Sequence, residues 1–287
     1  MPLQKTTAIL ALLALAFGFV SAQGDDHPVD QPLTMASEVG FAPFVMATAS
    51  GGVEGFSVDF CEAIAGRIGR PGCNIIDVPF SAIFSGLFSK NYEGIIAPTN
   101  ITPERAEEML YTEGYMAVGL GLMTLADEEL NSLSDLEGKV VVVNNGNLSD
   151  TWATENSDVY GFTVERVNTS TDSLQTLLTR RAFVAIADLP GAQYAAFQNS
   201  RIKVSHVIDT GRNYGLVFRN DDVEFRNLVE RAIEGLKLDG TLAELHLKWF
   251  GDYPPEDSAM NTVWFGYGPA GYTGFSADPH EPIWGND

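Results

Sequence analysis

Apolar and polar residues follow one another in blocks that predict alternating strands and helices. Three short apolar runs are bounded by glycine, proline and polar residues, as strands are. They lie at 33–37, 73–78 and 93–97. Between the first two runs, apolar residues at helical spacing predict a helix from a Ser57 N-cap to about Ile68, and a second helix carries Ile83 to Phe88. This order is typical of a parallel sheet with covering helices.

The same alternation returns further along the chain and predicts a second α/β lobe. Its strands are expected at 140–143, 162–167 and 183–187, with a helix at 172–180 before the last of them. Two extended segments, 118–125 and 204–209, lie between the lobes. We therefore expect the chain to cross twice and to form a two-strand hinge.

The rest of the chain returns to the first lobe and then loses its periodicity. A strand at 216–218 precedes a helix with an apolar stripe from Phe225 to Leu236, and Thr241 with Glu244 predicts a capping box for a last helix ending at Phe250. We expect lobe 1 to comprise 33–119 with 210–251, and lobe 2 to comprise 120–209. Residues 252–287 contain no lysine or arginine and predict either an irregular tail packed on the body or a disordered segment.

The amino-terminal segment has the pattern of a secretory signal peptide. Lys5 precedes an apolar run from Ala8 to Val20, and Val20-Ser21-Ala22 is a small-x-small cleavage site. The run is shorter than the roughly 20 residues of a membrane-spanning helix. We therefore expect residues 1–22 to be removed and the mature protein to be soluble in the periplasm. The formal net charge of −21 disfavours nucleic acid and anionic lipid as partners.

The chain has two cysteines, Cys61 and Cys73. Export would permit a disulfide between them. Their expected positions argue against one, because Cys61 lies in the first turn of a helix and Cys73 follows its far end, roughly 12 Å away at 1.5 Å per residue. A disulfide needs Cα atoms within about 7 Å.

The segment Ala97-Pro-Thr-Asn-Ile-Thr-Pro-Glu-Arg105 joins a strand end to a helix start. Thr102 is a good N-cap and Pro103 a good first helical residue. Backbone N–H groups at a helix start attract anions, and Arg105 adds a two-pronged donor matched to a carboxylate. An ordinary capped helix with a surface arginine has the same local sequence.

Taken in order, seven short motifs resemble the polar amino-acid family of extracellular solute-binding proteins, the ligand-capturing components of ABC importers, over about 33–255. The motifs are FAPF at 41–44, EGFSVD at 54–59, NITPER at 100–105, SDLEGK at 134–139, AD at 187–188, KLDGT at 237–241 and KWFG at 248–251. The resemblance implies an α/β fold of the two-lobed, type II periplasmic-binding-protein kind, in which each lobe is a mixed sheet flanked by helices.

The resemblance also implies where the amino-acid head group binds. Arg105, helped by Thr102 and Asn100, matches the grip on the ligand's α-carboxylate. Asp188 matches the acid that receives the α-ammonium from the second lobe. A strand-end acid that caps the following helix is the local alternative for Asp188. Opposite charges on opposite sides of the cleft suit a zwitterion.

The remaining implied contacts surround the ligand's side chain. Phe41 and Phe80 match two aromatics that sandwich it, although core packing is an alternative for Phe80. The loop from Asn144 to Asn147, followed by Leu148, matches backbone donors of the second lobe, and the asparagines depart from the family's usual serine, glycine and threonine. Further positions are Glu38, where an acid is common, and Pro98, where glycine is frequent.

These features predict a monomeric protein that captures an amino acid or related small zwitterion, polar or small and neutral, and docks on an ABC transporter permease. We expect no metal, because the four histidines are scattered without metal-ligand spacing. We also expect no enzymatic activity, no catalytic residue and no cofactor, because the sequence has no Gly-x-Ser-x-Gly elbow and no phosphate loop. Two alternatives remain open. One is a dehydratase-like enzyme with Glu38 as general acid, and the other is a ligand-sensing module for a signalling partner.

Overall fold

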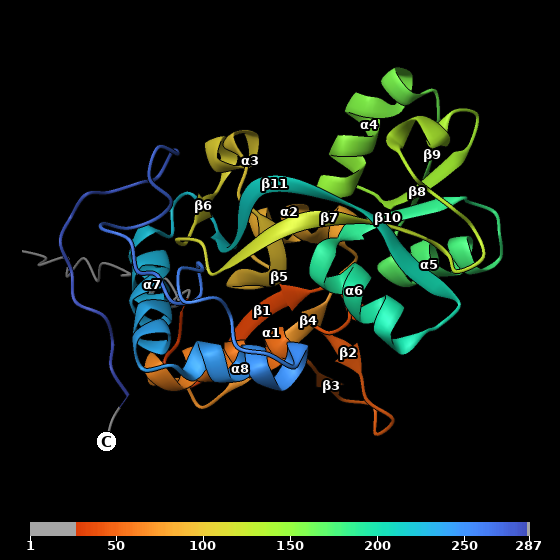
Figure 1. The fold of residues 1–287 in the computed structure, drawn as a ribbon. Coiled ribbons are helices and arrows are strands. Elements are labelled where there is room, and N and C mark those ends of the chain that lie inside the picture. The colour runs from red at the N-terminus through yellow and green to blue at the C-terminus, as the bar shows by residue number, and fades with distance from the viewer. Residues whose placement is uncertain (1–26, 286–287) are drawn as a thin grey trace, which may run out of the picture.

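The computed structural model describes residues 27–285, which fold into two α/β lobes joined by long strands (Figure 1). The predicted signal peptide, residues 1–22, lies outside the described residues. Within the described part of the chain, no helix has both the length and the apolar character needed to cross a membrane. We use lobe 1 for the elements around β1 and lobe 2 for those around β8.

Lobe 1 is built on three parallel strands in the order β4-β1-β5. Its strands are β1 (Leu33–Ser37), β4 (Cys73–Asp77) and β5 (Gly94–Asn100), with the short β2 (Met46–Ala47), β3 (Val53–Glu54) and β6 (Leu110–Tyr111) beside them. Its helices are α1 (Phe56–Arg67), α2 (Phe80–Phe88), α3 (Pro103–Glu108), α7 (Val223–Leu238) and α8 (Thr241–Phe250).

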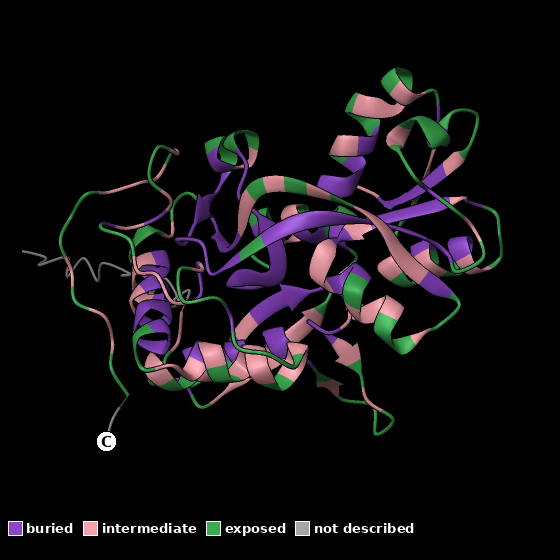
Figure 2. Cartoon of the chain, in the orientation of Figure 1, coloured by how far each residue is buried: buried purple, intermediate pink, exposed green. Residues whose placement is uncertain are grey.

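Successive residues of β5 point to opposite faces of the sheet, as in any strand. Ile96 belongs to the apolar core that α1, α7 and α8 cover, whereas Ile95 and Ala97 belong to the core under α2. The central strands are therefore buried on both faces, as Figure 2 shows.

Lobe 2 repeats the arrangement with parallel pairs β10-β8 and β8-β9. Its elements are the 3-10 turn η1 (Leu133–Leu136), strands β8 (Val140–Asn144), β9 (Thr163–Val167) and β10 (Val184–Asp188), and helices α4 (Leu148–Tyr160), α5 (Ser170–Leu178) and α6 (Leu189–Gln198). Val141 and Val143 face the core under α4, and Val142 faces the core under α5 and α6.

Two long antiparallel strands, β7 (Met116–Leu125) and β11 (Ile202–Phe218), connect the lobes. β11 also pairs with β5 in lobe 1, and β7 also pairs with β10 in lobe 2, so the two sheets form one continuous path. The sequence predicts a crossing segment at 204–209 and a separate strand at 216–218. The structure instead has one strand, whose pairing with β7 shifts register between Asp209 and Arg212.

Two helix starts differ from their predictions. α1 begins at Phe56 with Gly55 as N-cap, so Ser57 is not the cap. Gly55 has φ 143°, and a Cβ there would lie 2.1 Å from Phe44 O, so only glycine suits the position. The capping box of the last helix is also wrong, because Thr241 is already helical and its N–H donates to Asp239 Oδ1 at 3.0 Å.

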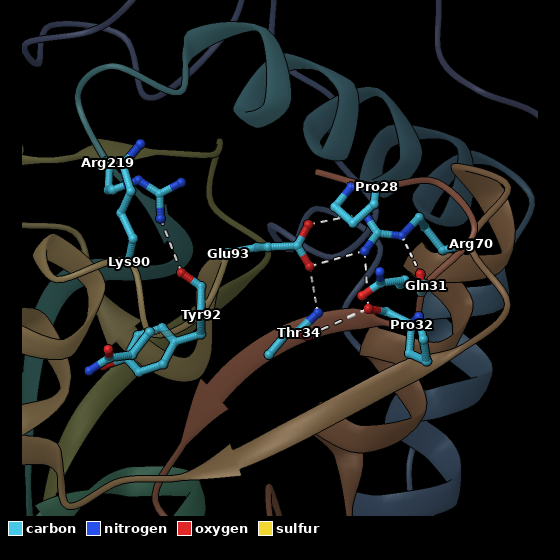
Figure 3. Close-up of a pocket in the computed structure, with 10 residues that line it drawn as sticks. Pro28, Gln31, Pro32, Thr34, Arg70, Lys90, Tyr92, Glu93 and Arg219 are labelled. Atoms are coloured by element: carbon cyan, nitrogen blue, oxygen red, sulfur yellow. Dashed lines mark hydrogen bonds and ion pairs between the residues drawn. The ribbon is translucent and has the colours of Figure 1, made fainter. Parts of the chain in front are cut away.

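A buried ion pair holds the amino ends of the lobe 1 strands. Arg70 donates from Nη1 to Glu93 Oε1 at 3.0 Å and from Nη2 to Glu93 Oε2 at 3.1 Å (Figure 3). Its Nε and Nη2 also donate to the carbonyls of Gln31 and Pro32, and Glu93 accepts from Thr34 N. This network fixes the segment that leads into β1.

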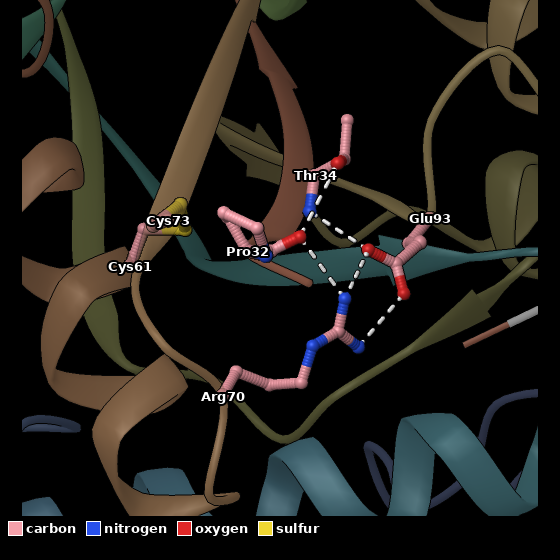
Figure 4. The surroundings of a disulfide bond; sticks show 6 residues. All are labelled: Pro32, Thr34, Cys61, Arg70, Cys73 and Glu93. Carbon is pink, nitrogen blue, oxygen red and sulfur yellow. Dashed lines mark hydrogen bonds and ion pairs between the residues drawn. A yellow bond between two sulfur atoms is a disulfide. The ribbon is translucent and has the colours of Figure 1, made fainter. Parts of the chain in front are cut away.

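Cys61 and Cys73 form a disulfide with a Cα–Cα distance of 5.8 Å (Figure 4). The prediction that the two cysteines are too far apart to bond is therefore wrong. It treats the chain as continuing along the helix axis, whereas after α1 the chain reverses at Gly69 and Gly72, which both have positive φ. β4 then begins beside the first turns of α1, and the bond closes a short loop.

The carboxyl-terminal tail, residues 252–285, lies along lobe 1 and wraps around α7 (Figure 1). Buried charges on α7 bond to it. Lys237 donates from Nζ to Thr262 O at 2.8 Å, and Glu230 Oε1 accepts from Gly268 N at 2.6 Å. The tail thus satisfies polar groups that α7 buries, which would otherwise cost free energy.

Candidate functional site

A narrow cavity lies between the lobes. It opens at the carboxyl ends of β1, β5, β8 and β10, the edge where α/β sheets place their ligands. The lining residues are Glu38, Phe41, Phe80, Ala97, Pro98, Asn100, Asn144, Asn147, Leu148, Ser170 and Asp188. Nine of the eleven residues predicted to bind ligand are in this lining, and Arg105 and Thr102 are not.

Asp188 is a buried carboxylate with one oxygen available. It ends β10, is 4% exposed, and accepts at Oδ2 from Tyr214 OH at 2.6 Å and from Asn100 Nδ2 at 3.3 Å. Its Oδ1 has no hydrogen-bond partner. Burial raises the pKa of Asp188 to about 6, although the bond from Tyr214, the charge of Arg105 and the bond from Asn100 oppose the rise. Asp188 is the N-cap residue of α6, as the local alternative has it, but its side chain makes no cap hydrogen bond.

Three helices begin at the cavity wall. Phe80 is the first residue of α2, Leu148 of α4 and Ser170 of α5. The N–H groups of a first helical turn have no acceptor within the helix, and the helix dipole is positive there. Asn147 caps α4 by accepting at Oδ1 from Asp150 N at 3.1 Å, so the Asn147 side chain is committed to the helix. The first N–H groups of α2 and α5 donate to Glu38, so the start of α4 is the one left to attract negative charge of a ligand.

Arg105 lies beside the cavity, on the lobe 1 side. Thr102 is the N-cap of α3, as predicted, and accepts from Arg105 N at 3.3 Å. The guanidinium donates from Nη1 to Asn100 O at 3.2 Å and from Nη2 to Gly146 O of lobe 2 at 2.8 Å. Its central carbon is 5.6 Å from the Phe80 ring centroid, within cation–π range. Arg105 therefore reaches across the lobes next to the start of α4.

The two predicted aromatics lie on the lobe 1 side. Phe80 is buried, and its ring meets that of Phe84 edge to face at 5.5 Å between centroids. Phe41 is half-buried and packs on Gly191 of α6, where a Cβ would lie 2.9 Å from the ring. Gly191, the third residue of α6, thus lets this ring reach across the lobes.

The prediction missed two residues of the lining, Ala97 and Ser170. Ala97 lies in β5 next to Pro98, and only its place in the sheet brings it to the wall. Ser170 had a local signal, because Thr169 followed three residues later by Asp172 resembles a capping box. Thr169 is in fact the N-cap of α5, accepting from Asp172 N at 3.0 Å.

Two other polar sites in the described part of the chain are less suited to a ligand. The cavity in Figure 3 lies at the amino ends of β1 and β5, and its Arg70 and Glu93 are bonded to each other. Elsewhere, carboxyl oxygens of Glu113, Glu230 and Glu234 lie within 4.8 Å of one another. Lys237 pairs with Glu113, and burial raises the pKa of Glu230 to about 8. The cluster thus has its own cation, and we assign no metal to it.

Comparison with known proteins agrees with this geometry. Residues 33–252 match the family model of the bacterial extracellular solute-binding proteins, family 3. The histidine-binding periplasmic protein of Salmonella typhimurium is 24% identical over 249 residues, covering 83% of this chain and 95% of that protein. The aligned region therefore covers most of this chain and nearly all of that protein.

Two solved structures of ancestral arginine-binding proteins have the same fold. The one bound to arginine has a TM-score of 0.73 and 26% identity, covering 78% of this chain and 100% of that one. The one bound to glutamine has a TM-score of 0.72 and 27% identity, covering 77% of this chain and 98% of that one. These matches confirm the predicted type II periplasmic-binding-protein fold. The chain belongs to family 3 of the bacterial extracellular solute-binding proteins.

Proposed function

We propose that this protein binds a free L-amino acid, or a closely related small zwitterion, in the cavity between its lobes. The observation that carries the proposal is Asp188 Oδ1, a buried carboxylate oxygen without a partner in a cavity that helix starts line on other sides. An α-ammonium group would supply the missing donor. It would also lower the pKa of Asp188 by placing a positive charge beside it.

The ligand's α-carboxylate is assigned to Arg105 and the start of α4. The Arg105 guanidinium already lies 2.8 Å from Gly146 O, one residue before the Asn147 cap. A carboxylate there would take the place of the Gly146 carbonyl as acceptor and form a charge-assisted pair, which is stronger than a bond to a neutral carbonyl. Leu148, the first residue of α4, would add a backbone N–H.

Binding is coupled to lobe closure in this proposal. Residues 33–119 with 210–251 would move as one body and 120–209 as the other, with β7 and β11 as the hinge. Ligand would shift the population from open to closed forms because it contacts both lobes only when they are closed. The protein would work as an exported periplasmic monomer, after loss of residues 1–22, and its closed form would dock on an ABC transporter permease.

The arrangement of Glu38 supports binding rather than catalysis. The alternative function, a dehydratase-like enzyme, would use this carboxyl as a general acid. A general acid needs a proton to give, whereas both oxygens of Glu38 accept hydrogen bonds from N–H donors.

Calorimetry with the purified mature protein and the individual L-amino acids tests the proposal. We expect saturable binding of at least one of them, and loss of that binding in Arg105→Ala with an unchanged circular dichroism spectrum. Arg181→Ala is the matched control, because Arg181 is an exposed arginine of lobe 2 outside the cavity lining. Near-normal affinity in Arg105→Ala, or turnover of the bound molecule, would refute the assignment.

A further inference from the structure

Glu38 is a buried carboxylate that belongs to neither the expected core nor the proposed head-group contacts. It follows β1 directly and is 3% exposed. Its Oε2 accepts from Phe80 N at 3.0 Å and from Asn144 Nδ2 at 3.1 Å. Its Oε1 accepts from Ser170 N at 2.7 Å and from the same Asn144 nitrogen at 3.4 Å.

The donors to Glu38 come from both lobes. Phe80 begins α2 in lobe 1, whereas Ser170 begins α5 and Asn144 ends β8 in lobe 2. One carboxylate thus faces the amino ends of two helices of nine residues each, which attract negative charge. Moving the lobes apart would keep the bond to Phe80 and break those to Ser170 and Asn144. The bonds from Ser170 and Asn144 therefore stabilise only the closed form.

The same bonds leave Glu38 little capacity to bind a cation. An ionised carboxylate has about four acceptor sites, and three N–H donors already point at this one. The other carboxylate in the lining is that of Asp188, which binds the ligand's α-ammonium group in the proposed function. A positively charged ligand side chain would therefore gain little from Glu38, whose charge three N–H donors already offset, and burying that side chain would be costly.

The unpartnered polar atoms of the lining are suited to a neutral side chain. Asn100 Oδ1 and Asn144 Oδ1 are buried and have no hydrogen-bond partner. A hydroxyl or amide of the ligand could donate to them. The scaffold itself does not fix the side chain, since similar ancestral proteins are solved with arginine and with glutamine.

We propose that Glu38 is a latch that holds the two lobes closed, and that the cavity consequently takes an amino acid with an uncharged side chain. The preference for an uncharged side chain rests on the proposed amino-acid binding. The latch concerns the lobes alone and can be measured without ligand. In this role Glu38 is a positioning residue, because it lines the cavity but acts on the ligand through the position of the lobes.

Two variants remove the latch from opposite lobes. Glu38→Gln replaces one acceptor oxygen by a donor. Ser170→Pro removes the N–H that Glu38 accepts, and proline is well tolerated as the first residue of a helix. The preceding residue, Thr169, is already extended with φ −131° and ψ 154°, the conformation that proline requires before it. Glu107→Gln on the exposed surface of α3 is the matched control.

Small-angle X-ray scattering of the ligand-free proteins reports the closed population, and stopped-flow binding reports dissociation. We expect both latch variants to have a larger radius of gyration than wild type and to release L-glutamine or L-serine about tenfold faster or more. The association rates of the two latch variants should change little. The Glu107→Gln control should keep the radius of gyration and the binding rates of the wild type. An unchanged radius of gyration and dissociation rate in both variants would overturn the latch.

The ligand class is tested with L-glutamine, L-serine, L-arginine and L-lysine on wild type and Glu38→Gln. We expect an uncharged amino acid to bind most tightly. If arginine or lysine binds more tightly, and Glu38→Gln selectively abolishes that binding, Glu38 is a ligand contact and the inference is wrong. If no amino acid binds the wild type, the proposed function fails, and the scattering result still decides whether Glu38 is a latch.

Discussion

Asp188→Asn should weaken ligand binding and at the same time stabilise the empty protein. The structure gives the reason for the second effect. Burial raises the pKa of Asp188 from its ordinary 3.8 to about 6, so the folded protein holds the charged form at a cost. At about 1.4 kcal/mol per pKa unit, neutralising the group should stabilise the folded state by roughly 3 kcal/mol at pH 7.

The sign of this effect depends on pH. Because the folded-state pKa lies above the unfolded value, the penalty is complete above about pH 6 and disappears as the pH falls towards 4. The stabilisation by Asp188→Asn should therefore be present at pH 7 and lost at pH 4. The amide oxygen can still accept from Tyr214, so the hydrogen bond that Asp188 accepts at 2.6 Å is not the cause.

Denaturant unfolding of the ligand-free proteins measures the stability, and calorimetry measures affinity for the amino acid. Loss of a charge-assisted hydrogen bond worth about 1.5–3 kcal/mol predicts affinity between about tenfold and 150-fold weaker. Asp158→Asn, an exposed acid in the same lobe, serves as the control. If Asp188→Asn destabilises the protein at pH 7, or if it binds the amino acid with wild-type affinity, the Asp188 carboxylate does not bind the ligand's ammonium group.

Three further predictions follow from the same structure. Amino-acid affinity of the wild type should fall about tenfold between pH 7 and pH 5, as the Asp188 carboxyl, whose pKa is about 6, is protonated; a flat calorimetric profile over this range would contradict this. Replacing Cys61 and Cys73 together by alanine should cost about 3 kcal/mol in urea unfolding while leaving affinity intact, because the bond closes a loop of 12 residues; equal stability would disprove a structural role. Gly235→Ala should detach the tail, because its Cβ would lie 1.9 Å from Ile283 O, whereas a Cβ at Gly66 meets nothing within 4 Å. Limited proteolysis should therefore release the tail in Gly235→Ala and not in Gly66→Ala.

Local sequence determined most of the elements and the cap of α3. The Thr102 cap depends on residues within one turn, and Pro103 fixes the first helical residue, so the sequence contains the whole cause. The family resemblance placed Asp188 and Asn144 at the ligand site, and both lie in the cavity lining.

Tertiary structure decided what depends on distant partners. The reversal after α1 brings Cys73 back to Cys61, which helix spacing alone does not show. Glu38 accepts from Ser170, 132 residues away, so its bonding depends on how the lobes meet. Arg105 likewise bonds Gly146 across the lobes. The sequence by itself determined which chemical groups surround the cavity. Only the fold decided which of them are already bonded to one another and which, like Asp188 Oδ1, lack a partner.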